Sequence, residues 1–183
     1  MQARASGILL PVSALPGPYG VGTFGREAMG FVDFLASAGQ KFWQILPLVP
    51  PGGGDSPYMS SSSFAGNPFF LDLEELEQEG LLTRKEVDEA RYSDIDRISY
   101  PWLHANRPRL FQLAWERGRD RCAAQLAEFL EQEKWWLSDY ALFLALREKF
   151  DGAELKDWPE PARKREAAYL EQCRRELADR IGY

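Results

Sequence analysis

The sequence has 183 residues, of which 45% are hydrophobic and 13% aromatic, a composition that can build a core and is unlike that of a disordered tail. Its 22 Lys and Arg residues stand against 28 Asp and Glu residues, giving a net charge of -6 without any basic cluster, which excludes nucleic acid as a partner. The two cysteines have no CxxC spacing and His104 is the only histidine, so we expect neither a disulfide framework nor a metal or other cofactor.

The first residues give no targeting or membrane signal. Only a few apolar residues precede Pro11, too few for the hydrophobic region of a signal peptide, and no apolar run approaches the length of a membrane span. We therefore expect a cytoplasmic protein without a membrane partner. The sequence leaves the oligomeric state unknown.

The first 40 residues predict a strand, a loop and a helix. Gly7–Pro11 is a continuous apolar run and predicts a strand that is buried on both faces. The segment Ala14–Gly22 is rich in Pro and Gly and must be a loop. Apolar residues at helical spacing then predict a helix over Phe24–Leu35, with Thr23 as its N-cap and Gly39 ending it in a left-handed conformation.

A second strand is predicted directly after this helix. The run Phe42–Leu46 is aromatic and β-branched and is closed by proline. Strand, helix and strand imply a parallel pair joined by a right-handed crossover. The loops that follow the two strands, Leu15–Gly20 and Pro50–Tyr58, should then share one face, because ligands bind at the carboxyl ends of parallel strands.

The composition changes near residue 73 to charged, helix-favouring sequence. We expect helices over Leu73–Glu79, Arg84–Tyr92, Arg107–Glu133, Trp135–Phe150 and Arg163–Ile181. No third buried strand is evident after Leu71, and two parallel strands alone leave both sheet edges unpaired. The sequence therefore predicts an α/β fold that is cut short, with residues 1–72 as a first βαβ unit and residues 73–183 as a helical subdomain.

The strongest functional signal lies in the loop after the second strand. Asp55-Ser56-Pro57-Tyr58 is followed by Asn67, and the rigid proline together with short polar side chains can hold the Tyr58 ring in one direction. An aromatic ring flanked by short polar groups suits a pyranose, which has an apolar face of C–H groups rimmed by hydroxyls. The alternative is a surface turn with Tyr58 folded onto the core, and the residues alone leave these two possibilities even.

A second aromatic run lies in the helical region. At helical spacing Trp136, Tyr140, Phe143 and Leu144 share one face, which predicts a core face rather than a ligand site, and leaves Asp139 solvated. Further on, Arg163 and Arg165 follow Trp158-Pro159, so that an arginine could stack on the Trp158 ring, although an ordinary loop and helix start fits equally well.

These segments together closely resemble the amylomaltases, or disproportionating enzymes, which are 4-alpha-glucanotransferases. Six segments carry the resemblance, in the order that the family has them: Gly7–Pro11, Leu15–Gly22, Trp43–Leu48, Gly54–Tyr58, Phe64–Pro68 and Trp136–Phe143. One such motif would be a weak hint, but six in register are specific. The resemblance implies the N-terminal portion of such an enzyme.

For the fold, the resemblance implies the start of a TIM (β/α)8 barrel, with Ile8–Leu10 and Phe42–Leu46 as the first two barrel strands. The helical remainder is then an inserted subdomain. A complete barrel takes about 250 residues, so the barrel is expected to be incomplete in this chain.

For the chemistry, the resemblance implies the transfer of α-1,4-glucan segments between maltooligosaccharides by a retaining double displacement. That reaction needs a nucleophilic Asp and an acid Glu about 5–5.5 Å apart. In the family these carboxylates follow later barrel strands, so we expect them beyond Tyr183 and assign no catalytic residue here. The isolated chain is expected to be inactive.

The resemblance does carry part of the substrate cleft over to this chain. Tyr58, supported by Ser56, Asp55 and Asn67, is similar to the sugar-contacting loop of the family, and the expected ligands are α-1,4-glucans. Two positions depart from the family. Residue 59 is Met where Gln is common. Residue 53 is Gly where some members have a tyrosine that serves a second, remote glucan site, so the sequence leaves undecided whether this chain has that second site.

Two other kinds of protein fit the same residues. One is a non-catalytic glucan-binding or partner-binding module that reuses these loops, and it would bind maltooligosaccharide tightly without turnover. The other is a helical scaffold without a ligand, in which replacing Tyr58 would leave oligosaccharide binding unchanged.

Overall fold

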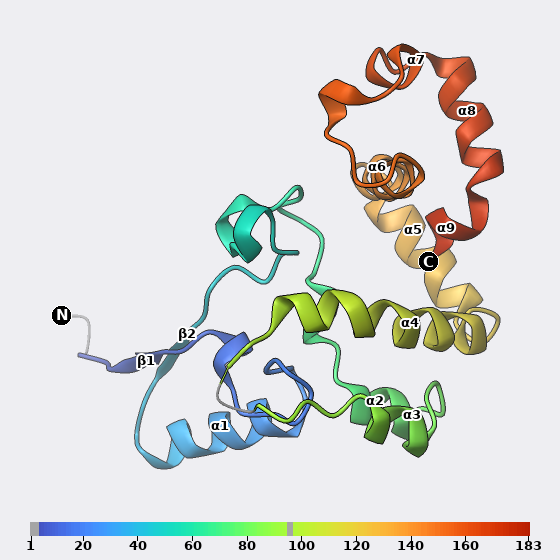
Figure 1. Cartoon of the computed structure of the whole chain (residues 1–183). Helices are drawn as coiled ribbons and strands as arrows, with labels where there is room; N and C mark the ends of the chain where they lie inside the picture. Colours follow the sequence, from blue (N-terminus) through green and yellow to red (C-terminus); the bar gives the residue numbers. More distant parts are fainter. Residues whose placement is uncertain (1–3, 95–96) are drawn as a thin grey trace. The chain divides into compact units, whose positions relative to one another are not determined.

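The computed structural model describes residues 4–94 and 97–183 (Figure 1). The chain divides into two compact units, Met1–Arg119 and Asp120–Tyr183. This division keeps residues 73–119 with the first βαβ unit. The expected boundary between residues 72 and 73, which concerns a barrel and its insertion, stays a prediction.

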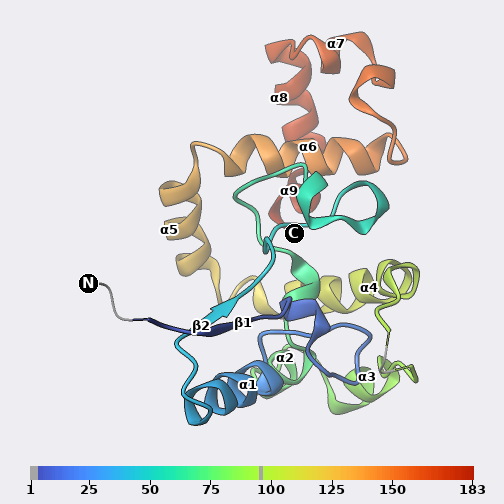
Figure 2. The same cartoon turned by 90° about the vertical axis from the view of Figure 1, so that its left-hand side faces the viewer.

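The first unit begins with the expected parallel strand pair. Strand β1 (Gly7–Leu9) pairs with β2 (Phe42–Gln44) so that Ile8 lies opposite Trp43, and the helix α1 (Arg26–Ser37) connects them. Figures 1 and 2 both show α1 on one side of the pair. The ring of Phe31 on α1 packs edge-on against Trp43, with centroids 5.0 Å apart. The predicted strand–helix–strand unit is thus confirmed.

The prediction that the first strand is buried on both faces is wrong. All three residues of β1 are exposed, and Leu9 keeps 57% of its surface accessible. Within residues 4–94 and 97–183 the sheet contains two strands, and α1 covers one side of them. An apolar strand run needs neighbours on both sides to become buried, and the described residues do not provide them.

The two ends of α1 differ in how well the sequence predicts them. The helix starts after Gly25 instead of Thr23, because the Thr23 hydroxyl donates to the carboxylate of Asp72. At the other end Gly39 has φ +71°, and the N–H of Gln40 donates to the carbonyl of Leu35 at 2.9 Å. The left-handed glycine at the helix end is confirmed, while the threonine cap is wrong because a tertiary partner takes its side chain.

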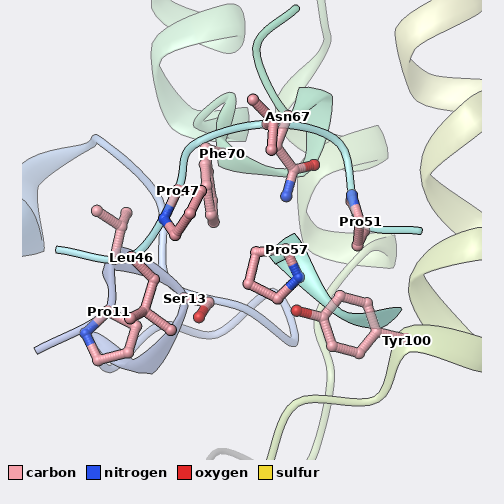
Figure 3. A pocket seen from close by; sticks show the side chains of 11 residues that line it. Pro11, Ser13, Leu46, Pro47, Pro51, Pro57, Asn67, Phe70 and Tyr100 are labelled. Carbon is pink, nitrogen blue, oxygen red and sulfur yellow. The ribbon is translucent and has the colours of Figure 1, made fainter. Parts of the chain in front are cut away.

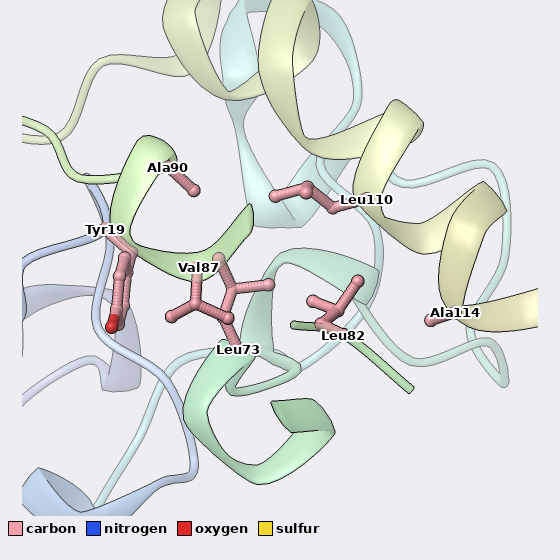
Figure 4. Close-up of a cluster of buried hydrophobic side chains, with 7 residues drawn as sticks. All are labelled: Tyr19, Leu73, Leu82, Val87, Ala90, Leu110 and Ala114. Atoms are coloured by element: carbon pink, nitrogen blue, oxygen red, sulfur yellow. The ribbon is translucent and has the colours of Figure 1, made fainter. Parts of the chain in front are cut away.

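Helices α2 (Leu73–Gln78), α3 (Arg84–Glu89) and α4 (Tyr100–Gly118) complete the first unit. One apolar cluster joins them to the loop after β1 (Figure 4), and its buried members are Tyr19, Leu73, Leu82, Val87, Ala90, Leu110 and Ala114. Since Tyr19 lies in that loop, the helices hold the loop in place.

A buried arginine ties α4 to the same loop. Arg107 has 0% of its surface exposed, and its Nη2 donates to the carbonyl of Tyr19 at 3.1 Å. Burial lowers the pKa of Arg107 to about 10, so the group keeps its charge at neutral pH. Its Nε and Nη1 have no hydrogen-bond partner among the described residues. The fold therefore holds the positive charge of Arg107 in a fixed position beside the loop.

The carboxylate of Glu86 at the N-terminal end of α3 makes the stability of the first unit depend on pH. Thr83 and Glu86 form a capping box, and Arg117 donates to both oxygens of Glu86. The hydrogen bonds from Arg117, followed by those from Thr83, lower the pKa of Glu86 to about 2. Because the folded pKa is the lower one, this stabilisation is present above pH 4.5 and is lost as the pH falls toward 2.

We therefore expect the Glu86→Gln variant to be less stable than the parent at pH 7, and the difference to shrink as the pH falls from 4.5 to 2. Urea unfolding at several pH values measures it. The variant Glu75→Gln, which removes a carboxylate from an exposed residue, serves as the control. A Glu86→Gln deficit that stays constant down to pH 2 would contradict this account.

The second unit consists of short helices. They are α5 (Ala123–Glu133), α6 (Leu137–Lys149), α7 (Glu160–Arg163), α8 (Ala167–Glu176) and α9 (Ala178–Gly182). The predicted continuous helices Arg107–Glu133 and Arg163–Ile181 are therefore wrong. The first is interrupted by the turn after Gly118, and the second by Arg165, which adopts a left-handed conformation with φ +56°. Within the described part of the chain, no helix combines the length and apolarity that crossing a membrane requires.

The face of α6 that enters the core is centred elsewhere than predicted. Leu142 and Leu146 are buried together with Trp158, while Leu144 is 42% exposed. Phe143 stacks on Trp158 with ring centroids 5.6 Å apart, so that part of the predicted stripe is at the core. The loop that carries Trp158 approaches the helix on the Leu142 side, and this approach selects the buried face.

The expectation that Asp139 is solvated is confirmed, since 56% of its side-chain surface is exposed, but the side chain also has two partners that the sequence did not predict. Its carboxylate pairs with Arg165 at 2.6 Å and with Arg174 at 3.3 Å. The hydrogen bond from Arg165, the largest cause, lowers the pKa of Asp139. The sequence left open whether an arginine stacks on Trp158, and in the structure Arg165 pairs with Asp139 while the rings of Phe143 and Phe150 lie against Trp158.

Candidate functional site

A hollow lies beyond the carboxyl ends of β1 and β2. It is lined by Pro11, Val12, Ser13, Leu46, Pro47, Val49, Pro51, Pro57, Asn67, Phe70 and Tyr100 (Figure 3). Its volume is about 120 Å³, below the range of about 300–1,000 Å³ that ligand pockets usually have. The hollow is therefore too small to be a complete ligand pocket, but it can be one part of a cleft. It lies at the edge of the sheet where ligands of parallel α/β folds bind.

The two loops expected at this edge contribute differently. Pro51 and Pro57 of the second loop line the hollow. From the chain after β1 it is Pro11–Ser13 that lines it, while Pro16–Tyr19 lines a separate space of about 30 Å³ beside Asp72. A space of that size suits one water molecule, so the larger hollow is the candidate site.

The loop Gly52–Met59 is closed by its own hydrogen bonds. The N–H of Gly52 donates to the carbonyl of Ser56 at 3.0 Å, and the N–H of Tyr58 donates to the Ser56 hydroxyl at 3.3 Å. Pro57 begins a short 3-10 turn and fixes its own φ angle. The loop is consequently a compact unit that can present a side chain without much conformational freedom.

Tyr58 projects from this loop. The side chain has 72% of its surface exposed, so the alternative in which Tyr58 folds onto the core is wrong. Ser56 acts through its hydroxyl on the backbone of the same turn. The arrangement leaves the ring available for stacking, as the sequence interpretation required. Sugar contact by Tyr58 and Ser56 stays a prediction.

Asn67 is buried at the wall of the hollow. Its Oδ1 accepts a hydrogen bond from the N–H of Phe69 at 3.0 Å, and its own N–H donates to the carbonyl of Leu48 at 2.8 Å. Figure 3 shows its amide directed into the hollow. Asn67 therefore holds the segment after β2 in place and offers an amide to a ligand from the same position.

Asp55 lies at the edge of the site with two residues of α4. Its φ is +58°, in the left-handed region that Asp tolerates better than most residues, and its Oδ1 lies 3.3 Å from Nε2 of His104. Tyr100 lines the hollow, and burial, followed by the charge of Asp55, raises its pKa. The sequence interpretation missed Tyr100 and His104 because no local pattern links positions 100 and 104 to residue 55.

The chemistry of the lining suits binding more than bond cleavage. In the described part of the chain the residues around the hollow are apolar or carry a hydroxyl or an amide, and they include no Asp or Glu. Hydroxyl and amide groups can exchange hydrogen bonds with a polyhydroxylated ligand. Cleaving a glycosidic bond with retention needs two carboxylates, which this lining does not supply.

A parallel βαβ unit with a hollow at the carboxyl ends of its strands defines an α/β protein of the class that binds small molecules at the sheet edge. The family model described as 4-alpha-glucanotransferase matches residues 10–183. The chain belongs to this family.

Curated relatives and a solved structure agree with the assignment. The chain is 40% identical over 173 residues to the 4-alpha-glucanotransferase of Clostridium butyricum, which covers 94% of this chain and 36% of that protein. It is 41% identical over 180 residues to the enzyme of Thermus thermophilus, covering 98% and 36%. The structure of an amylomaltase from Streptococcus agalactiae in complex with acarbose matches with a TM-score of 0.94 and 39% identity, over 99% of this chain and 37% of that one. The resemblance predicted from the six motifs is confirmed, and the shared lengths fit an N-terminal portion.

Proposed function

We propose that this chain forms part of an enzyme that transfers α-1,4-glucan segments between maltooligosaccharides by a retaining double displacement. The names of its relatives support glucan transfer. The chain spans a little over a third of the length of these relatives, so activity, substrate and mechanism are proposed for the protein as a whole. The composition favours a cytoplasmic location for it.

For the fold we propose that β1 and β2 are the first two strands of a TIM barrel. The parallel register of the pair, with a helical crossover between them, is what such a barrel repeats. The exposure of Leu9 and of the rest of β1 is the second support, because barrel strands are buried once their neighbours are present.

For the site we propose that Tyr58 stacks on a glucose unit while Asp55, Ser56 and Asn67 shape the loop and the wall beside it. The observation that carries this proposal is the exposed Tyr58 ring on a loop closed by its own hydrogen bonds, next to the hollow. A loop that is already closed loses less conformational entropy on binding than a mobile loop does.

We further propose that the isolated chain does not catalyse transfer. The lining of the hollow contains no carboxylate among the described residues, and Asp55, the acidic residue at its edge, is engaged with His104. A retaining transfer requires a nucleophile and an acid on opposite sides of the scissile bond.

Replacing Tyr58 tests the binding role. We expect Tyr58→Ala to weaken the binding of maltoheptaose about fivefold, since an aromatic contact contributes about 0.5–1.5 kcal/mol. Tyr58→Phe should keep most of the affinity because it keeps the ring. NMR titration of the chain with maltoheptaose measures both.

Met59→Ala is the matched control, because Met59 is a similarly exposed neighbour in the same turn. Unchanged affinity in Tyr58→Ala would contradict the stacking role. Tight binding by the parent chain, without any turnover, would favour a non-catalytic glucan-binding module instead.

A further inference from the structure

We propose that His104 is a positioning residue, which holds the loop Gly52–Met59, and with it the ring of Tyr58, at the hollow through its contact with Asp55. This role deepens the proposed function and depends on it only for the ligand. The contact joins two segments that are 49 positions apart in the sequence.

The imidazole of His104 is itself held in place on α4. Its ring packs edge-on against the buried Phe69, with centroids 5.1 Å apart, and lies 6.5 Å from the ring of Tyr100 one turn earlier. Two aromatic neighbours restrict the side chain although it is partly exposed. His104 therefore presents Nε2 to Asp55 from a fixed direction.

The loop at the other end of the contact is closed by hydrogen bonds between its own backbone groups. The N–H of Asp55 donates to the carbonyl of Gly52 at 3.0 Å, and the N–H of Gly52 donates to the carbonyl of Ser56. Since Met59 also donates back to Ser56, at 3.2 Å, these residues form a closed set from Gly52 to Met59. A hydrogen bond at Asp55 therefore fixes the orientation of the whole loop, including Tyr58.

The chemistry of the pair is a donor on His104 and an acceptor on Asp55. Nε2 carries a proton in the imidazolium and in one of the two neutral tautomers, and the Nε2–H group then donates a hydrogen bond to the carboxylate oxygen. Both side chains are partly exposed, and such pairs are worth little individually. The expected effect of losing the contact is therefore a change of roughly two- to fivefold in glucan affinity.

Two variants separate the donor from the ring. His104→Phe keeps an aromatic ring against Phe69 and removes the donor, whereas His104→Gln keeps a donor and removes the ring. We expect His104→Phe to shift the backbone amide signals of residues 52–59, to speed their hydrogen exchange and to weaken maltoheptaose binding two- to fivefold. His104→Gln should return all three toward the parent values. Asn106→Ala, a change at a nearby exposed residue of α4, is the control.

A double variant isolates the pair. Asp55→Gly removes the carboxylate and suits the positive φ at this position. In the double variant of Asp55→Gly and His104→Phe, hydrogen exchange of the loop amides should be no faster than in Asp55→Gly alone. Each single change already removes the whole Asp55–His104 contact, so the second change removes nothing more.

Additive effects in the double variant would overturn the proposal. So would parent-like loop amides in His104→Phe, or equal disturbance of the loop by the Phe and Gln variants, which would indicate a packing role. If the loop responds as expected but the parent chain binds no maltoheptaose, the positioning of the loop by His104 stands and the proposed glucan function fails.

Discussion

Replacing Gly52 by alanine is expected to displace the Tyr58 loop and to weaken maltoheptaose binding at least about tenfold. A Cβ on residue 52 would lie 1.7 Å from the carbonyl oxygen of Met59 and 2.4 Å from its carbonyl carbon. Both are backbone atoms, so the clash is relieved only if the loop opens. Overpacking of this kind costs about 1–3 kcal/mol, and the hydrogen bond from Gly52 to Ser56 closes the same loop.

Gly53→Ala is the matched control for this change. A Cβ at residue 53 would meet only the terminal methyl of Met59, at 3.4 Å, which is an ordinary contact with a flexible side chain. NMR spectra of the loop amides and a maltoheptaose titration compare the two variants. Parent-like spectra and affinity in Gly52→Ala would show that the described loop conformation is not the one that binds.

The second large effect is expected in the core of the first unit. Leu73→Ala should lower the free energy of unfolding of this unit by about 2–5 kcal/mol, because removing a buried leucine side chain leaves a cavity. Leu73 has 0% of its surface exposed and packs in the cluster with Tyr19 and Val87. Since Tyr19 belongs to the loop after β1, the cavity also loosens that loop.

Leu71→Ala is the corresponding control, because Leu71 is 50% exposed two positions earlier. Its expected cost is below about 1 kcal/mol. Urea unfolding followed by the methyl signals of Val87 reports on this unit alone. Equal losses in the two variants would contradict the placement of Leu73 at the centre of the cluster.

Much of the first unit could be predicted from local sequence. The apolar runs before Pro11 and Pro47 identify the paired strands, and Gly39 marks the helix end, because each of these signals acts within a few residues. The hydrogen bond that takes Thr23 away from the helix could not be predicted, since its acceptor Asp72 is 49 positions away. Long-range partners decide such side chains.

The second unit shows the same limit. Arg165 breaks the predicted helix in a left-handed conformation without a glycine or proline to signal it. Its partner Asp139 lies 26 positions earlier on α6, whereas Arg165 itself lies between α7 and α8. Charged residues at helical spacing fit a solvated face as well as they fit an ion pair between segments. The sequence alone therefore predicted a solvated Asp139 and did not predict its pairing with Arg165.

The candidate site is divided in a similar way. The motif around Pro57 predicted a rigid turn but left open whether the Tyr58 ring points outward or folds onto the core, and the structure shows the ring exposed. Tyr100 and His104 reach the same site from α4. Their arrival there follows from how α4 packs, which no short motif encodes.

The most direct test of the account is incubation of the purified chain with maltotriose, followed by analysis for glucose and longer maltooligosaccharides. The same assay is run on a fusion of this chain to the part of the Thermus thermophilus relative that it does not match. We predict that the fusion produces both kinds of product, that Tyr58→Ala reduces its activity, and that the chain alone produces neither. Disproportionation by the chain alone would contradict the account, because it would mean that residues within these 183 positions perform the catalysis.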